Sequence, residues 1–135
     1  MTEILDRKVN TSHELHELME NYNWDFGYEI PLWAIRNPIC DKGTVLMIYW
    51  KADPGYFCKY KDRNEVRTSE LPLFDLINEI EQKYSSGFYK SNNIPFNPRN
   101  DNNPKLKGYN WVDEYSDLPK KRLIPALMLL PNKDD

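Results

Sequence analysis

Apolar side chains recur at helical spacing in two parts of the chain. The first stripe consists of Leu15, Leu18, Met19 and Tyr22, and the second runs through residues 72–84. Residues three and four positions apart lie on the same face of an α-helix, while polar residues between them face water. The pattern therefore predicts two amphipathic helices separated by about fifty residues of different character.

Capping residues and prolines place further boundaries. Thr11 and Glu14 have the spacing of a capping box, which predicts that the first amphipathic helix begins after Thr11. Residues 1–10 show no regular pattern, so we expect an extended or frayed lead-in there. Pro31 suits the first turn of a helix, and a short helix is predicted over residues 32–36.

A continuous apolar run, TVLMIYWK at residues 44–51, fits a buried strand and a buried helix equally well. Its β-branched and aromatic residues favour a strand, and the turn residues 53–55 would then close a hairpin over residues 45–60. An N-cap at Asp41 favours a helix instead. Periodicity leaves both interpretations open.

The last third of the chain changes composition. Residues 90–108 are rich in asparagine, proline and charge, which predicts a long irregular loop anchored by Ile94 and Phe96. After this loop, Asp117 stands before Leu-Pro as a candidate N-cap of a short helix. No repeat or linker divides the chain, so residues 1–135 are predicted to form one domain.

Composition excludes several classes of protein. The hydrophobic fraction of 40% with 13% aromatics is enough for a packed core. A net charge of −3 argues against a general nucleic-acid binder, and no apolar run approaches the roughly 20 residues of a membrane span. Two cysteines make no disulfide framework, and residues 1–10 lack an apolar signal segment. We therefore expect a cytoplasmic protein with neither nucleic acid nor membrane as partner.

Charge is unevenly distributed along the chain. Residues 1–30 contain seven acidic and two basic side chains, a net charge of −5, so the remainder carries +2. Such an acidic segment can attract a basic protein partner. The predicted partner-binding residues lie on this acidic segment and on a second cluster of aromatic and acidic side chains: Glu14, Glu17, Glu20, Asp25, Trp111, Asp113, Glu114 and Tyr115.

Metal ligation is not expected, and neither is a cofactor. His13, His16, Cys40 and Cys58 are the right ligand types for zinc, but the cysteines are single and far apart, without a C-x-x-C pair. The five glycines are isolated, which excludes a glycine-rich phosphate loop.

Catalysis is not expected either. The alternative hypotheses are a small enzyme with a site near Asp25, Glu29 and Cys40, and a self-associating regulatory module. Aromatic residues alternate with lysines at residues 56–63, but an element with an inward aromatic face gives the same pattern as a base-stacking surface.

The stretch at residues 21–53 resembles the small bacterial family known as domain of unknown function 4274. The resemblance rests on an N-x-N-W-D turn, a following proline and a C-D-x-G-T opening before the apolar run. It covers residues 15–53, and more loosely extends to residue 84. It implies a helix at residues 44–52 and no activity. The matching positions are Asn23, Trp24, Asp25, Gly27, Pro31, Cys40, Asp41, Gly43 and Thr44.

With this resemblance, we predict a mainly α fold: a compact single domain of about four to six helices with long ordered loops. The alternative is an α+β fold with the hairpin at residues 45–60. Size, acidity and compactness are similar to those of bacterial immunity proteins, although no motif supports that analogy. The leading hypothesis is a monomeric immunity protein that occludes the active or substrate-binding face of a cognate toxin, with a nuclease as the expected class.

Overall fold

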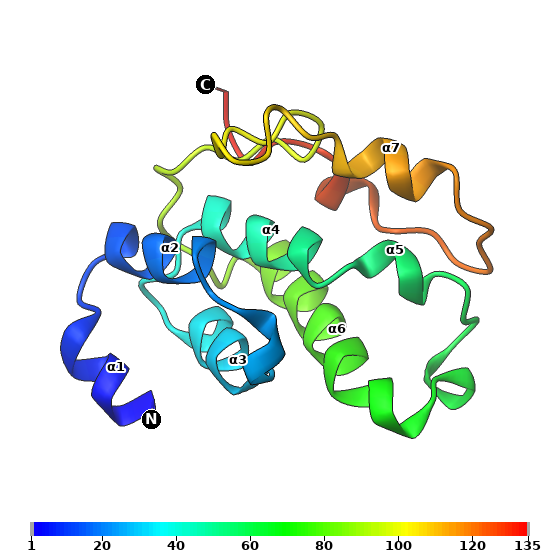
Figure 1. The fold of residues 1–135 in the computed structure, drawn as a ribbon, viewed down its shortest axis with the longest axis horizontal. Coiled ribbons are helices and arrows are strands. Elements are labelled where there is room, and N and C mark those ends of the chain that lie inside the picture. Colours follow the sequence, from blue (N-terminus) through cyan, green and yellow to red (C-terminus); the bar gives the residue numbers. More distant parts are fainter. Residues whose placement is uncertain (1, 135) are drawn as a thin grey trace.

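Helix α4, Lys42–Lys51, lies at the centre of the protein and packs against four other helices, α2, α3, α5 and α6 (Figure 1). The structure is a computed structural model that describes residues 2–134. Within that range it contains seven α-helices and no β-strand. The other α-helices are α1 (Thr2–Lys8), α2 (Ser12–Glu20), α3 (Glu29–Arg36), α5 (Pro54–Phe57), α6 (Leu71–Ser86) and α7 (Trp111–Ser116).

The predicted mainly α fold is confirmed, and the hairpin at residues 45–60 is wrong, because that segment contains α4 and α5. Every residue from 43 to 50 is buried. A helix that is enclosed by neighbours on all sides needs apolar residues all round, which removes the helical period from its sequence. This enclosure explains why the sequence pattern could not separate helix from strand.

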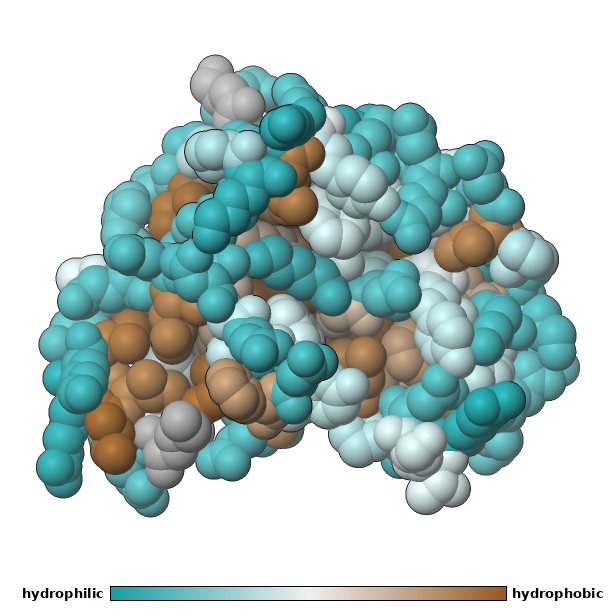
Figure 2. Space-filling view, in the orientation of Figure 1, coloured by the Kyte–Doolittle hydropathy of each residue, from teal (hydrophilic) through white to brown (hydrophobic). Residues whose placement is uncertain are grey.

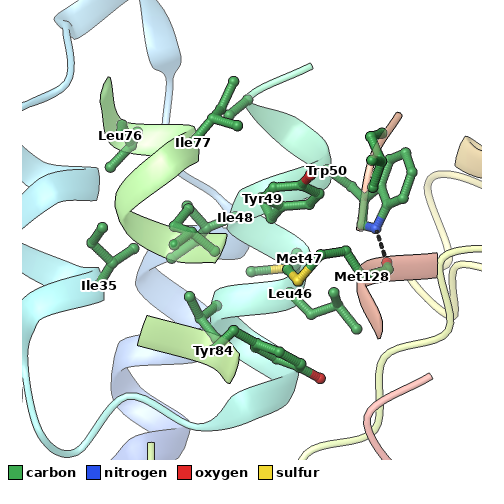
Figure 3. Close-up of a cluster of buried hydrophobic side chains, with 14 of the residues drawn as sticks. Ile35, Leu46, Met47, Ile48, Tyr49, Trp50, Leu76, Ile77, Tyr84 and Met128 are labelled. Atoms are coloured by element: carbon green, nitrogen blue, oxygen red, sulfur yellow. Dashed lines mark hydrogen bonds between the residues drawn. The ribbon is translucent and has the colours of Figure 1, made fainter. Parts of the chain in front are cut away.

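The core lies between α3, α4 and α6 (Figure 3). Ile35 of α3, Ile48 of α4 and Ile77 of α6 are completely buried there. The indole of Trp50 donates a hydrogen bond to the carbonyl oxygen of Met128 at 3.0 Å. Met128 lies in a 3₁₀ turn, Ala126–Leu129, so the C-terminal segment is fixed to the central helix.

Asp41 joins α4 to a distant loop. Its carboxylate, 0% exposed, accepts hydrogen bonds from the N–H of Gly43 (2.9 Å), the hydroxyl of Ser91 (2.5 Å) and the N–H groups of Asn93 (2.7 Å) and Ile94 (3.1 Å). Burial by itself raises the pKa of Asp41, but these hydrogen bonds outweigh it and lower the pKa below its ordinary value. Asp41 is therefore the N-cap of α4 and also ties the loop at residues 91–94 to that helix. We call this set of contacts the Asp41 clamp.

Gly43 allows the same loop to pass over the first turn of α4. A Cβ atom at this position would lie 1.7 Å from the carbonyl oxygen of Ile94, which no side chain could tolerate without a shift of the loop backbone. The loop continues without helix or strand through residues 90–108 and is anchored by buried Ile94 and Phe96. The C-D-x-G-T motif is explained by this contact between loop and helix.

Two predicted element boundaries differ from the structure. The N-terminal residues form α1 rather than an extended lead-in, and Trp33 Nε1 of α3 donates to Asp6 Oδ1 of α1 at 2.7 Å. Near the other end, α7 begins after Asn110, whose side chain accepts from the N–H of Asp113 at 3.0 Å. Asp117 is the C-cap of α7 rather than the N-cap of a later helix.

Hydrophilic side chains cover most of the face shown in Figure 2, while hydrophobic side chains gather at its lower left, over α1 and α3. A groove runs there along α3, with Leu32, Trp33 and Pro38 among its lining residues. None of the helices within residues 2–134 has the length and apolar character needed to cross a bilayer.

Candidate functional site

An exposed aromatic ring stands on the acidic N-terminal part of the protein. Phe26, in the 3₁₀ turn Trp24–Phe26, is 80% exposed, the most exposed large hydrophobic side chain within residues 2–134. It lines an open groove together with Glu14 and Glu17 of α2. Asp25 precedes it in the same turn. We refer to Glu14, Glu17, Asp25 and Phe26 as the acidic face.

Local hydrogen bonds fix the turn that presents Phe26. The side chain of Asn23 accepts from the N–H of Asp25 at 2.9 Å, and the hydroxyl of Tyr22 donates to the carbonyl oxygen of Gly27 at 2.7 Å. The ring of Trp24 packs edge-on against Tyr22, with 6.0 Å between ring centroids. The N-x-N-W-D motif thus builds a defined turn, and Phe26 is held outward before any partner arrives.

The carboxylates of the acidic face differ in how much of their bonding capacity is used. Glu14 accepts from the N–H of Asn10 at 3.1 Å, and Thr11 Oγ1 accepts from the N–H of Glu14 at 3.1 Å, so these residues cap α2. The carboxylates of Glu17 and Asp25 have no hydrogen bond or ion pair with any residue in the described range 2–134. They remain available to a cation on another molecule.

Glu20, the fourth predicted residue of this surface, belongs to the packing of α2 against α4. Its carboxylate lies 3.8 Å from His16 Nε2, and its carbonyl oxygen accepts from Lys51 Nζ at 2.9 Å. His16 Nδ1 lies 2.8 Å from Thr44 Oγ1, and burial lowers the pKa of His16 although Glu20 and Asp41 act to raise it. Glu20 therefore supports the fold more directly than it offers charge to a partner.

The second predicted surface is divided by the structure. Tyr115 is 7% exposed, and its hydroxyl accepts from the N–H of Ile124 at 3.0 Å, so it is a core residue. Asp113 is exposed to solvent. Trp111 Nε1 donates to Asp101 Oδ2 at 3.0 Å, and Glu114 accepts a hydrogen bond from the hydroxyl of Tyr109.

Trp111 and Glu114 line a cleft between the C-terminal end of α4, the short helix α5 and α7, which we call the α7 cleft. Asp53 lies on its opposite wall, at the junction of α4 and α5. Asp53 has φ of 64°, a left-handed conformation that few residues other than glycine adopt. Burial raises the pKa of Asp53, and the nearby N–H of Tyr56, which donates to the backbone carbonyl oxygen of Asp53 at 3.3 Å, counteracts part of that rise. The full lining is Trp50, Lys51, Asp53, Gly55, Trp111, Glu114, Tyr115 and Leu118.

The residues of the alternative site near Asp25, Glu29 and Cys40 differ in exposure to solvent. Asp25 and Glu29 are exposed, whereas Cys40 is completely buried. Burial raises the pKa of the Cys40 thiol, with Asp41 adding to the effect, and the thiol donates to the carbonyl oxygen of Asp41 at 3.7 Å. Buried cysteines in apolar surroundings have low reactivity, and the contacts of Cys40 are those of a packing residue.

Side chains of the types that bind metal ions are also dispersed through the structure. Cys58 is buried and its thiol lies 3.5 Å from the carbonyl oxygen of Pro54, while His16 is held by Thr44. Within residues 2–134, no three or more His, Cys, Asp and Glu side chains are grouped so that they could hold a metal ion.

The family described as "Domain of unknown function (DUF4274)" matches residues 10–85, more than half of the chain. The chain belongs to this family. Comparison with curated proteins and with solved structures gave no match. The DUF4274 region includes the acidic face, Asp41 and helices α2 to α6 except the last residue of α6, whereas the loop residues bonded to Asp41 and helix α7 lie outside it. One wall of the α7 cleft is therefore not part of the matched region.

Sequence reasoning missed three features of these surfaces. Phe26 was not separated from the core aromatics, because no local signal distinguishes an exposed ring from a buried one. Asp53 could have been suspected, since Asp is one of the few residues that tolerate a left-handed turn before Pro-Gly. Asp101 is buried although it lies in a stretch of polar residues, because its carboxylate accepts from Trp111 Nε1 at 3.0 Å and from the N–H of Asn103 at 2.9 Å.

Proposed function

We propose that this DUF4274 protein is an immunity protein, which binds a cognate toxin and occludes its active or substrate-binding face. The acidic face carries this proposal: Phe26 is an exposed aromatic anchor and stands beside the unpaired carboxylates of Glu17 and Asp25. Aromatic side chains are enriched at the core of protein–protein interfaces, and polar and charged side chains lie at the rim.

The chemistry of the acidic face indicates a basic partner. Residues 1–30 carry a net charge of −5, and the two free carboxylates can pair with Lys or Arg without breaking any bond inside the protein. Complementary charge speeds association and excludes acidic competitors. A nuclease domain must bind phosphate and presents such a basic surface, so a nuclease toxin is the class of partner we propose.

The rigidity of the turn at residues 24–26 also supports binding. Ordering a flexible loop on association costs free energy, and the bonds of Asn23 and Tyr22 place that cost in folding rather than in binding. We propose that the protein acts as a monomer in the cytoplasm, where it would meet the toxin.

A growth assay tests the proposal directly. The toxin domain would be sought in the reading frames that neighbour this chain's own and expressed in a susceptible host, with and without the chain. We expect growth arrest by the domain alone and restored growth on coexpression, together with a complex on size-exclusion chromatography. Growth arrest that coexpression leaves unchanged, without a complex, would overturn the immunity function.

The same pair of proteins then tests the surface. Glu17→Lys and Phe26→Ala should each weaken binding at least tenfold, with Glu17→Lys slowing association most at low salt. Asp117→Lys makes the same charge change at the C-cap of α7 and is the matched control, because Asp117 lies outside the acidic face. Equal slowing by Glu17→Lys and Asp117→Lys would mean that overall charge, not this face, governs association.

A further inference from the structure

The α7 cleft combines two carboxylates and an aromatic ring in one concave site. Asp53 and Glu114 are on its walls with the indole of Trp111 beside them. We propose that this cleft binds a guanidinium group, supplied by an arginine side chain of a protein partner. A guanidinium is planar, stacks on aromatic rings and donates paired hydrogen bonds to carboxylates, which are the three properties that this lining matches.

The aromatic wall of the cleft is fixed in place. Trp111 Nε1 donates to Asp101 Oδ2 at 3.0 Å, which sets the orientation of the indole. Tyr109 packs edge-on against the same ring, with 4.9 Å between centroids. Trp111 is nevertheless only partly buried. A cation can therefore approach an indole that does not have to reorient.

The acidic walls have bonding capacity to offer. The hydroxyl of Tyr109 donates to Glu114, which positions this carboxylate and leaves other lone pairs free. Asp53 forms no side-chain cap of α5, and burial raises its pKa, so a cation in the cleft would stabilise its charged form. A bound positive charge would therefore interact favourably with both carboxylates.

Lys51 is a cation in the lining of the cleft, but its ammonium group is bonded to a residue outside the cleft. Its ammonium donates to the carbonyl oxygen of Glu20 at 2.9 Å, at the C-terminal end of α2, where the helix dipole favours a positive charge. Burial lowers the pKa of Lys51, and Asp101 and Glu20 counteract part of that effect. Two carboxylates of the cleft thus remain for a second cation.

The inference rests on the proposed function only for the source of the arginine, since a free probe tests the cleft by itself. The probe is N-acetyl-arginine amide, titrated into the ¹⁵N-labelled protein while the Trp111 indole resonance is followed by NMR. N-acetyl-citrulline amide has the same shape without the charge and is the matched control ligand. We expect a saturable shift with the arginine probe and at least tenfold weaker binding of the citrulline probe.

Variants assign the effect to the cleft. Glu114→Gln keeps the shape of the side chain and should weaken binding of the arginine probe at least fivefold. Asp117→Asn removes one charge from the same end of α7, outside the cleft, and should leave binding unchanged. Phe26→Ala, on the acidic face, should also have no effect, which separates this site from the proposed toxin surface.

Three results would overturn the proposal. Equal shifts by the arginine and citrulline probes would show that charge is not recognised. Unchanged affinity in Glu114→Gln, confirmed as folded by its NMR spectrum, would remove the carboxylate from the site. Arginine-induced shifts confined to resonances outside the cleft would place binding elsewhere.

Discussion

The Asp41 clamp and the acidic face both depend on carboxylates, and they use them in opposite ways. Asp41 is completely buried, and its two oxygen atoms accept four hydrogen bonds from α4 and the loop that crosses it. Glu17 and Asp25 make none within residues 2–134, and Phe26 beside them is 80% exposed. Asp41 and the acidic face lie within the DUF4274 match at residues 10–85, whereas the loop held by Asp41 lies beyond it.

This contrast separates residues that build the fold from residues available for binding. A buried carboxylate with all its hydrogen bonds made inside the protein stabilises one arrangement of the chain. An exposed carboxylate without a partner adds little to the free energy of folding. It can contribute to binding when it pairs with a positive charge on another molecule. Four predictions test the division, beginning with the largest expected effect.

Asp41→Ala should lower the free energy of unfolding by about 3–5 kcal/mol, because four donors, of which those of Gly43 and Ile94 belong to buried residues, lose a charged acceptor. Urea denaturation of the variant and the parent measures the difference. Asp113→Ala, which removes an exposed carboxylate, is the control and should change stability by less than about 0.5 kcal/mol. A loss below about 1 kcal/mol in Asp41→Ala would mean that the clamp does not hold the loop.

Gly43→Ala should cost about 2–4 kcal/mol, since the added Cβ would lie 1.7 Å from the carbonyl oxygen of Ile94 and the loop backbone must move. Thermal unfolding and the NMR signals of residues 91–94 would follow the change. Lys42→Ala, one position earlier in α4, is the matched substitution. If both variants had the same stability, close approach of the loop would not be the reason for glycine.

Acid should destabilise the protein through Asp41. The pKa of Asp41 is lowered in the folded state relative to its ordinary value of 3.8, so its contribution is present above pH 3.8 and is lost as the pH falls through the folded value. Urea unfolding between pH 7 and pH 2 should show this loss. Asp41→Asn should start less stable and should show a flatter pH profile over the same acidic range, and parallel profiles would contradict this assignment.

Phe26→Ala and Glu17→Lys should change the free energy of unfolding by no more than about 0.5 kcal/mol each, because neither side chain is buried or bonded within the described structure. Their effect should appear only in partner binding. Urea unfolding measures the first quantity. Destabilisation above about 1 kcal/mol would show that these residues contribute to the stability of the fold.

The amino-acid sequence determined the elements whose signals are local. The stripe on α2, its cap at Thr11 and the stripe on α6 were readable because each of these helices has one buried and one solvated face. The family was also readable, since its motifs lie within one short stretch, residues 21–44, and the match at residues 10–85 confirms it. The acidic character of residues 1–30 followed from counting charges.

Only the tertiary structure decided the features that depend on distant neighbours. The run at residues 44–51 is a helix that is enclosed on all sides, so its apolar residues show no helical period. Phe26 is exposed and Tyr115 is buried, although both are aromatic residues in short polar contexts. Burial is set by which other segments pack on a side chain, and in this protein such contacts join residues 78 and 79 positions apart.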